Sequence, residues 1–290
     1  RREVPAAGVA AWSLWNLWKR RNPKQRKILV SEPCLTSREE KYLMSAFRST
    51  FISGGAGSYK RRLETEFAAL CGCKYGVTCA NGTVAINLAL LAAGLNPGDE
   101  VILPSFTYVA SAAAVVTCGG IPVFADCDPD LGLIDAAAIR AAISPRTKFI
   151  MAVHLYGHPC DMDAINAIAK EHGIQVMEDA AEAHGAMYKG RPVGSLSSFA
   201  TFSFYANKVM TTGEGGIVVT NDPQLAQQMV FLRGHAMSAE TRFWHTAVGF
   251  NFRLSNLLCA VGVAQLECFK ELFQGRRKVI TSYRQNLNGF

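Results

Sequence analysis

Beyond residue 27, short runs of β-branched, aromatic and other apolar residues alternate with longer stretches in which apolar positions recur at helical spacing. The short runs predict strands at Tyr75–Cys79, Glu100–Leu103, Ile121–Ala125, Thr147–Val153, Ile174–Glu178, Phe199–Ser203 and Gly216–Thr220. The longer stretches predict helices at Thr83–Ala93 and Met162–His172, and a helical run at Cys259–Leu287. This alternation predicts an α/β fold, in which helices cover both faces of a mostly parallel sheet.

Charge is distributed unevenly along the 290 residues. The net charge is +7, but residues 1–27 contain eight basic residues and one acidic residue, so residues 28–290 carry no net charge. A basic folded domain is therefore excluded, and no nucleic acid is expected as a partner. We expect residues 1–26, a basic tryptophan-rich leader, to be disordered and dispensable for chemistry. Contact of this leader with a membrane surface is the alternative.

The nine cysteines are scattered along the chain in an odd number. Two CxxC units, which a structural zinc site would need, are absent, and the histidines His154, His158 and His184 lack metal-ligand spacing. We expect no metal site. We read the cysteines as reduced thiols and expect a cytoplasmic protein.

Three segments carry candidate chemistry at places where ligands of parallel sheets bind. Asn81-Gly82-Thr83 lies between a strand and a helix, where it is either an anion site or a plain helix cap. Glu178-Asp179 ends a strand, and Asp179 is either a ligand contact or a capping acid. Lys208 lies in a glycine-rich turn between two strands, which suits either an exposed loop lysine or a nucleophile.

Together, these segments resemble the DegT/DnrJ/EryC1/StrS family of sugar aminotransferases from about Lys27 onward. The resemblance rests on the order and spacing of Asn81-Gly82-Thr83, Glu178-Asp179-Ala180-Ala181, Ser203-Phe204, Asn207-Lys208, Thr212-Gly213-Glu214-Gly215-Gly216 and Gly249-Phe250-Asn251-Phe252-Arg253-Leu254. It implies the aspartate-aminotransferase fold (fold type I), a three-layer sandwich, with pyridoxal phosphate (PLP) as the cofactor.

The resemblance also implies a role for each matching residue. Lys208 would hold PLP covalently and then move a proton, and Asp179 would pair with the pyridine nitrogen of the cofactor. Tyr108 would stack on the ring. The other implied contacts are Gly82, Thr83 and Ser203 at the phosphate, Glu182 near the 3-hydroxyl, and Asn251 at the phosphate of the other subunit's cofactor in a homodimer with shared active sites.

The implied function is transamination of a nucleotide-linked keto sugar. Relatives that dehydrate sugars carry His in place of the lysine, so Lys208 favours amination. Glu182 and nearby segments are closest to the branch that forms perosamine for lipopolysaccharide O-antigen, so we expect GDP-4-keto-6-deoxymannose to become GDP-perosamine, with glutamate as donor. Arg233, Arg242 and Arg253 are candidate pyrophosphate partners, though each could be a surface arginine.

Two alternatives remain open: a UDP- or dTDP-keto-sugar aminotransferase, and a truncated, catalytically silent relative that acts as a binding or regulatory module. We expect residues 27–255 to form the large PLP-binding domain. Residues 256–290 would begin a small C-terminal domain that is incomplete, because relatives extend further. Cofactor binding should therefore survive better than turnover.

Overall fold

The computed structural model describes residues 29–55 and 57–287. The basic leader at residues 1–26, with the behaviour expected of it, lies outside the described residues. Packing places residues 33–290 in one unit and the preceding residues in another. The sheet, helices and pocket described below all belong to the unit of residues 33–290.

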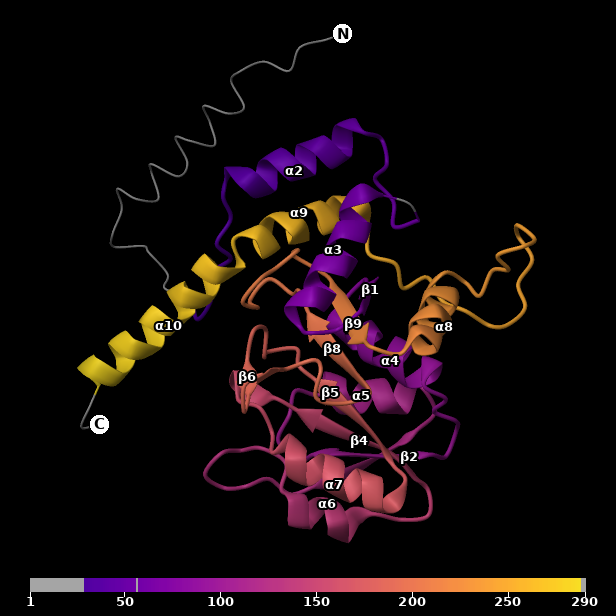
Figure 1. The fold of residues 1–290 in the computed structure, drawn as a ribbon, viewed down its shortest axis with the longest axis vertical. Helices are drawn as coiled ribbons and strands as arrows, with labels where there is room; N and C mark the ends of the chain where they lie inside the picture. Colours follow the sequence, from indigo (N-terminus) through magenta and orange to yellow (C-terminus); the bar gives the residue numbers. More distant parts are fainter. Residues whose placement is uncertain (1–28, 56, 288–290) are drawn as a thin grey trace. The chain divides into compact units, whose positions relative to one another are not determined.

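A seven-stranded sheet runs through this unit (Figure 1). Its strands, in chain order, are β1 (Tyr75–Cys79), β2 (Glu100–Pro104), β3 (Ile121–Ala125), β4 (Thr147–Val153), β5 (Gln175–Asp179), β8 (Phe199–Ser203) and β9 (Gly216–Thr220). Their spatial order is β1-β9-β8-β5-β4-β2-β3. The strands from β8 to β3 pair in parallel, whereas β9 is antiparallel to both of its neighbours. The mostly parallel sheet predicted from the sequence is thus confirmed.

Strand bounds agree closely with the prediction. β1, β3, β4, β8 and β9 have the predicted limits, β2 extends one residue further, and β5 is shifted by one residue. The shift follows from pairing with β4, which continues to a final pair between Val153 and Asp179. Asp179 is therefore the last residue of its strand, at the carboxyl edge of the sheet.

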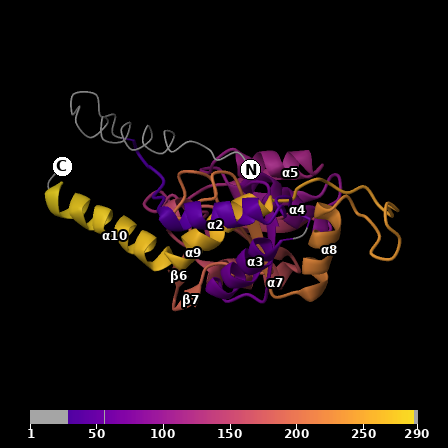
Figure 2. The same cartoon turned by 90° about the horizontal axis from the view of Figure 1, so that it is seen from above.

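Helices cover both faces of the sheet (Figure 2). The described helices are α2 (Ser37–Arg48), α3 (Ser58–Leu70), α4 (Gly82–Ala92), α5 (Ala110–Thr117), α6 (Ala136–Ala142), α7 (Met162–His172), α8 (Pro223–Arg233), α9 (Asn256–Glu267) and α10 (Phe269–Asn286). A 3-10 turn at Leu155–Gly157 and a small hairpin of β6 (Met187–Tyr188) and β7 (Arg191–Pro192) complete the described elements. The single helical run predicted near the C-terminus is two helices, which meet at Cys268.

Two apolar cores lie against the two faces of the sheet, which makes three layers. Alternation along β8 shows how the sequence builds both cores. Phe199 packs with α4, α5 and α8, whereas Ala200 and Phe202 pack with α3, α7 and α9 on the other face. Both β8 and β9 are buried along their whole length, and most of their residues are accordingly apolar.

Local sequence sets the ends of the helices that flank the site. Asn81 caps α4, since its side chain accepts the N–H of Val84. In α7, Asp161 accepts the N–H of Ala164 at the start, and Gly173 ends the helix in a left-handed conformation with φ 67°. These caps fix where each helix begins, and α4 begins at the edge of the sheet where Asp179 lies.

Candidate active site

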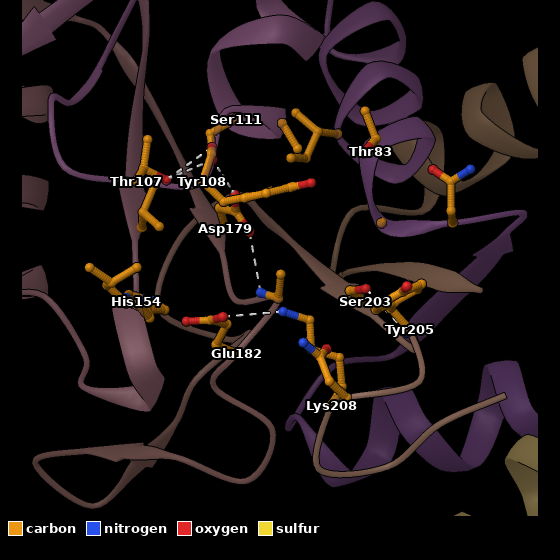
Figure 3. A pocket seen from close by; sticks show the side chains of 18 of the residues that line it. Thr83, Thr107, Tyr108, Ser111, His154, Asp179, Glu182, Ser203, Tyr205 and Lys208 are labelled. Atoms are coloured by element: carbon orange, nitrogen blue, oxygen red, sulfur yellow. Dashed lines mark hydrogen bonds and ion pairs between the residues drawn. The ribbon is translucent and has the colours of Figure 1, made fainter. Parts of the chain in front are cut away.

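A cavity of about 540 Å³ opens at the carboxyl edge of the parallel strands, beside the start of α4 (Figure 3). This is where ligands of open α/β sheets bind, and the volume suits a cofactor. Seven of the eight residues that the sequence singled out line it: Gly82, Thr83, Tyr108, Asp179, Glu182, Ser203 and Lys208. Segments more than 120 residues apart in the chain thus meet in one pocket.

Asp179 lines the pocket and is only 5% exposed. Its Oδ2 accepts the hydroxyl of Ser111 at 2.8 Å, and its Oδ1 accepts the N–H of Ala181 at 3.2 Å. Burial raises the pKa of Asp179 above its ordinary value, whereas these two hydrogen bonds oppose the rise because they favour the charged form. The site therefore contains a carboxylate that gains from a cationic partner.

Lys208 also lines the pocket, from the turn between β8 and β9 (Figure 3). Its Nζ donates to Oε1 of Glu182 at 3.2 Å, and the side chains of Lys208 and Glu182 are 16% and 35% exposed. The other carboxylate oxygen of Glu182 accepts the N–H of Tyr156 at 2.9 Å. From α10, Arg276 donates to the backbone carbonyls of Asn207 and Lys208 at 3.2 and 3.3 Å. The amine thus faces the pocket from a turn that is held by a neighbouring helix.

An anion-binding end lies where α4 begins. The helix starts at Gly82, beside Thr83, and β8 ends at Ser203 close by. A Cβ built on Gly82 would lie 2.8 Å from the Cβ of Ser203, so only glycine allows this approach. Unpaired N–H groups at a helix start, together with two hydroxyls, suit a phosphate.

A buried histidine–carboxylate pair supports the floor of the pocket. His154 lines the cavity, and its Nδ1 accepts the N–H of Cys160 at 3.1 Å. Its Nε2 therefore carries the proton and donates to Oε2 of Glu178 at 3.0 Å. Glu178 also accepts the N–H groups of Gly194 and Leu196, so this fully buried carboxylate is well satisfied. The sequence had indicated only that His154 lacks metal-ligand spacing.

Asn251 does not line this pocket. It is exposed, pairs with Gly234 in a β-bridge, and accepts both Nε and Nη2 of Arg253 at 3.1 and 2.9 Å. This position within one chain agrees with the expectation that Asn251 serves another subunit's site, but it does not test that expectation.

Three arginines were candidate pyrophosphate partners, and the prediction is wrong for Arg233. It is only 3% exposed, and its Nη1 donates to Oε1 of Glu64 and to the carbonyl of Thr78, each at 2.6 Å. A guanidinium buried in such contacts holds the core together and is closed to a ligand. Arg242 is exposed and lies 4.8 Å from the ring centre of Phe243, and Arg253 is also exposed, so both remain candidates.

Other lining residues escaped sequence reasoning, namely Thr107, Ser111, His154, Tyr205 and Glu214. For Ser111 a signal existed, since it is a hydroxyl inside the otherwise apolar first turns of α5, Ala110–Thr117. Its spacing of three residues from Tyr108 places both near one end of that helix.

Among the residues that the structure describes, no three His, Cys, Asp or Glu side chains lie close enough together to hold a metal ion. Within the same residues, all nine cysteines are free thiols, and helices of the length and hydropathy needed to cross a membrane are absent.

The donor set of the pocket fits PLP. The cofactor has a phosphate, a pyridine nitrogen and an aldehyde. The start of α4 with Ser203 offers anion donors, Asp179 offers a buried carboxylate, and Lys208 offers an amine. A Cβ on Gly82 would collide with Ser203, so glycine is what lets the start of α4 lie against the end of β8, where both can face one anion.

Comparison with known proteins agrees with this chemistry. The model of the DegT/DnrJ/EryC1/StrS aminotransferase family matches residues 33–290. The chain is 49% identical to the GDP-perosamine synthase of Caulobacter vibrioides over 90% of this chain and 70% of that protein. It is 42% identical to that of Escherichia coli O157:H7, over 90% and 71%. Other relatives are named for UDP- and dTDP-linked sugars.

Among solved structures, the PLP form of a protein described as a sugar aminotransferase from Streptococcus pneumoniae superposes with a TM-score of 0.86. It is 27% identical, and the match covers 91% of this chain and 72% of that one. The family match, the curated relatives and this fold agree with one another. The chain belongs to the DegT/DnrJ/EryC1/StrS aminotransferase family and is a PLP-dependent aminotransferase.

Proposed function

We propose that this protein aminates C4 of a nucleotide-linked 4-keto-6-deoxy sugar, converting GDP-4-keto-6-deoxymannose to GDP-perosamine with glutamate as donor. The observation that supports this proposal best is the pocket, which is lined by the buried carboxylate of Asp179 and by the amine of Lys208. Identity of 49% to a GDP-perosamine synthase supports the sugar. Such a product would feed lipopolysaccharide O-antigen synthesis, and the nine free thiols favour the cytoplasm.

The residues of the pocket divide the chemistry between them. Bound PLP supplies a carbonyl carbon that takes up an amino group and a protonated ring that draws electrons from it. Asp179 would keep the ring nitrogen protonated, because a buried carboxylate gains most from a neighbouring cation. Lys208 would hold the cofactor covalently and, when released, carry a proton to or from the reacting carbon. Glu182 would receive the released ammonium group, as it does in this structure.

The remaining roles concern binding. Gly82, Thr83 and Ser203 would hold the phosphate at the start of α4, and Tyr108, which is 75% exposed, would stack on the ring. We further propose residues 27–255 as the PLP-binding domain, with residues 256–290 beginning a smaller one.

We also propose a homodimer in which Asn251 enters the partner's site. Mixing Lys208→Ala and Asn251→Ala chains tests this. In a hybrid dimer, one site would combine the intact Lys208 of one chain with the intact Asn251 of the other. We expect the mixture to recover activity that neither variant has alone. An inactive mixture of chains that do exchange subunits would reject the shared site.

The substrate is tested by measuring kcat/KM for matched GDP-, UDP- and dTDP-linked 4-keto-6-deoxy sugars with glutamate. We expect the GDP-sugar to be preferred. Relatives named for UDP- and dTDP-sugars make these the second candidates. A preference for either of them by about tenfold, or about 1.4 kcal/mol in transition-state binding, would reject the GDP-sugar and keep the aminotransferase.

A further inference from the structure

Three side chains form a short hydrogen-bonded row in the wall of the pocket (Figure 3). The hydroxyl of Ser111 lies 2.8 Å from Oδ2 of Asp179 and 3.0 Å from the hydroxyl of Thr107. Thr107 belongs to the loop that carries Tyr108, Ser111 lies in the first turn of α5, and Asp179 ends β5. Two parts of the chain, residues 107–111 and the end of β5, are thus joined by the hydrogen bond between Ser111 and Asp179, and Thr107 is tied to Ser111 within its own segment.

The number of available protons gives this row a direction. Ser111 has one O–H, and it donates that proton to Oδ2 of Asp179. Its oxygen can then only accept from Thr107, so Thr107 donates to Ser111. Because the N–H of Ala181 occupies Oδ1, each oxygen of the carboxylate receives one donor. Both donors favour the charged form of Asp179 and fix the plane of its carboxylate.

Burial makes the Ser111 hydrogen bond valuable. Ser111 is 1% exposed and Asp179 5%, so water cannot replace a lost hydroxyl without entering the core. Without that hydroxyl, Oδ2 would be a buried, charged oxygen with one donor fewer. The ionisable groups near Asp179 are His154 after β4, Lys208 in the β8–β9 turn, and Glu182 beside Lys208. Lys208 acts in the same direction as Ser111, because its positive charge also favours the charged form of Asp179.

We propose that Ser111, with Thr107 behind it, is a positioning residue that keeps the carboxylate of Asp179 charged and oriented toward the ring nitrogen of PLP. This inference rests on the proposed role of Asp179 in the proposed function. It adds that one row of hydroxyls also links Asp179 to the loop of Tyr108. The positions of the Asp179 carboxylate and the Tyr108 ring are therefore coupled to each other.

Equilibrium binding of PLP to the full chain, followed by visible absorbance across a range of pH, tests the proposal. We expect Ser111→Ala to weaken binding by about tenfold or more, as loss of a hydrogen bond to a buried charge does. Thr107→Val should weaken it by about threefold, because it acts only through Ser111. Thr117→Val is the matched control. Thr117 lies in the same helix, and its hydroxyl bonds Ala114 and Asn87 away from Asp179, so PLP binding should stay unchanged.

The acid side of the pH profile separates positioning from a general structural role. In Ser111→Ala the carboxylate should take up its proton at higher pH, so PLP binding should be lost at a higher pH than in the wild type. If Ser111→Ala does not fold, Thr107→Val must show the same upward movement. Wild-type affinity and an unmoved acid side in both variants would overturn the inference.

The same measurement distinguishes this inference from the proposed function. A selective loss of PLP binding in Ser111→Ala, in a chain that aminates no nucleotide sugar, supports the inference and rejects the function. A wild-type chain that binds no PLP would overturn both.

Discussion

Asp179 and Lys208 line the same pocket, but they differ in burial and in the parts of the chain that hold them. Asp179 closes a central strand, is 5% exposed, and receives hydrogen bonds from a helix and from its own backbone turn. Lys208 lies in a turn, and its partner Glu182 is 35% exposed. Its backbone is held from outside the sheet by Arg276 of α10.

This difference matches what each residue must do. The acid has a fixed task, so rigid packing and low dielectric strengthen its interaction with a bound cation. In the proposed function Lys208 would detach from the cofactor and return to it, so it would need a partner that binds the free amine only weakly. An ion pair with a partly exposed carboxylate is of that kind, since such pairs contribute little net free energy.

Removing the amine should have the largest effect. In Lys208→Ala, we expect turnover to fall by at least about a thousandfold, since both the covalent attachment and the proton carrier are lost. Steady-state kinetics measure the loss, and Lys189→Ala, an exposed lysine paired with Asp163, is the control. Borohydride reduction and peptide mapping should place the adduct on Lys208. An adduct on another lysine would contradict the assignment.

Neutralising the buried acid should come next. In Asp179→Asn, we expect PLP to bind about a hundredfold more weakly, because the ring nitrogen would lose a buried ionic partner. Titration with PLP, followed by visible absorbance, measures this. Asp163→Asn, which removes an exposed carboxylate, should bind normally. Equal affinity in Asp179→Asn and the wild type would show that the acid does not face the cofactor nitrogen.

Acidification should lower the stability of the fold through His184, which is buried in the core near Lys208. His184 is buried among Phe67, Phe202 and Phe204, and burial lowers its pKa to about 3. The unfolded chain therefore binds the proton more readily, so stability is complete above about pH 6.5 and falls as the pH drops toward 3. The slope from this one group is at most about 1.4 kcal/mol per pH unit.

Urea unfolding at pH 7.5 and pH 5 measures this slope. His184→Leu should lose less stability on acidification than the wild type, and Lys208→Ala should change the slope only in part, because burial is the main cause of the lowered pKa of His184 and the charge of Lys208 is the lesser one. An unchanged slope in His184→Leu would show that other groups govern acid unfolding.

The smallest effect should come from α10. In Arg276→Ala, we expect kcat to fall by about threefold, because the turn of Lys208 loses two hydrogen bonds to its carbonyls that solvent can partly replace. PLP affinity, which depends on Asp179, should change less. Arg277→Ala, the exposed neighbour on the same helix, is the control. A larger loss in PLP affinity than in kcat would mean that Asp179 and Lys208 are not independent.

The sequence by itself determined the sheet and the main elements of the site. Strands such as β4 and β8 are apolar runs between clear turn signals, so local composition sets their limits. Asp179 and Lys208 could be selected because strand ends of a parallel sheet meet at one edge, and their roles came from the family's motifs.

Only the tertiary structure decided which partners these residues have. Ser111 meets Asp179 across 68 residues, Arg276 meets Lys208 across 68, and Arg233 is buried against Glu64 across 169. The two arginines have the same local sequence signal as surface arginines, and the apolar surroundings of Ser111 in the sequence do not name its partner. Local sequence cannot decide this, because burial depends on which distant segments pack against the side chain, and that packing is set by the whole core.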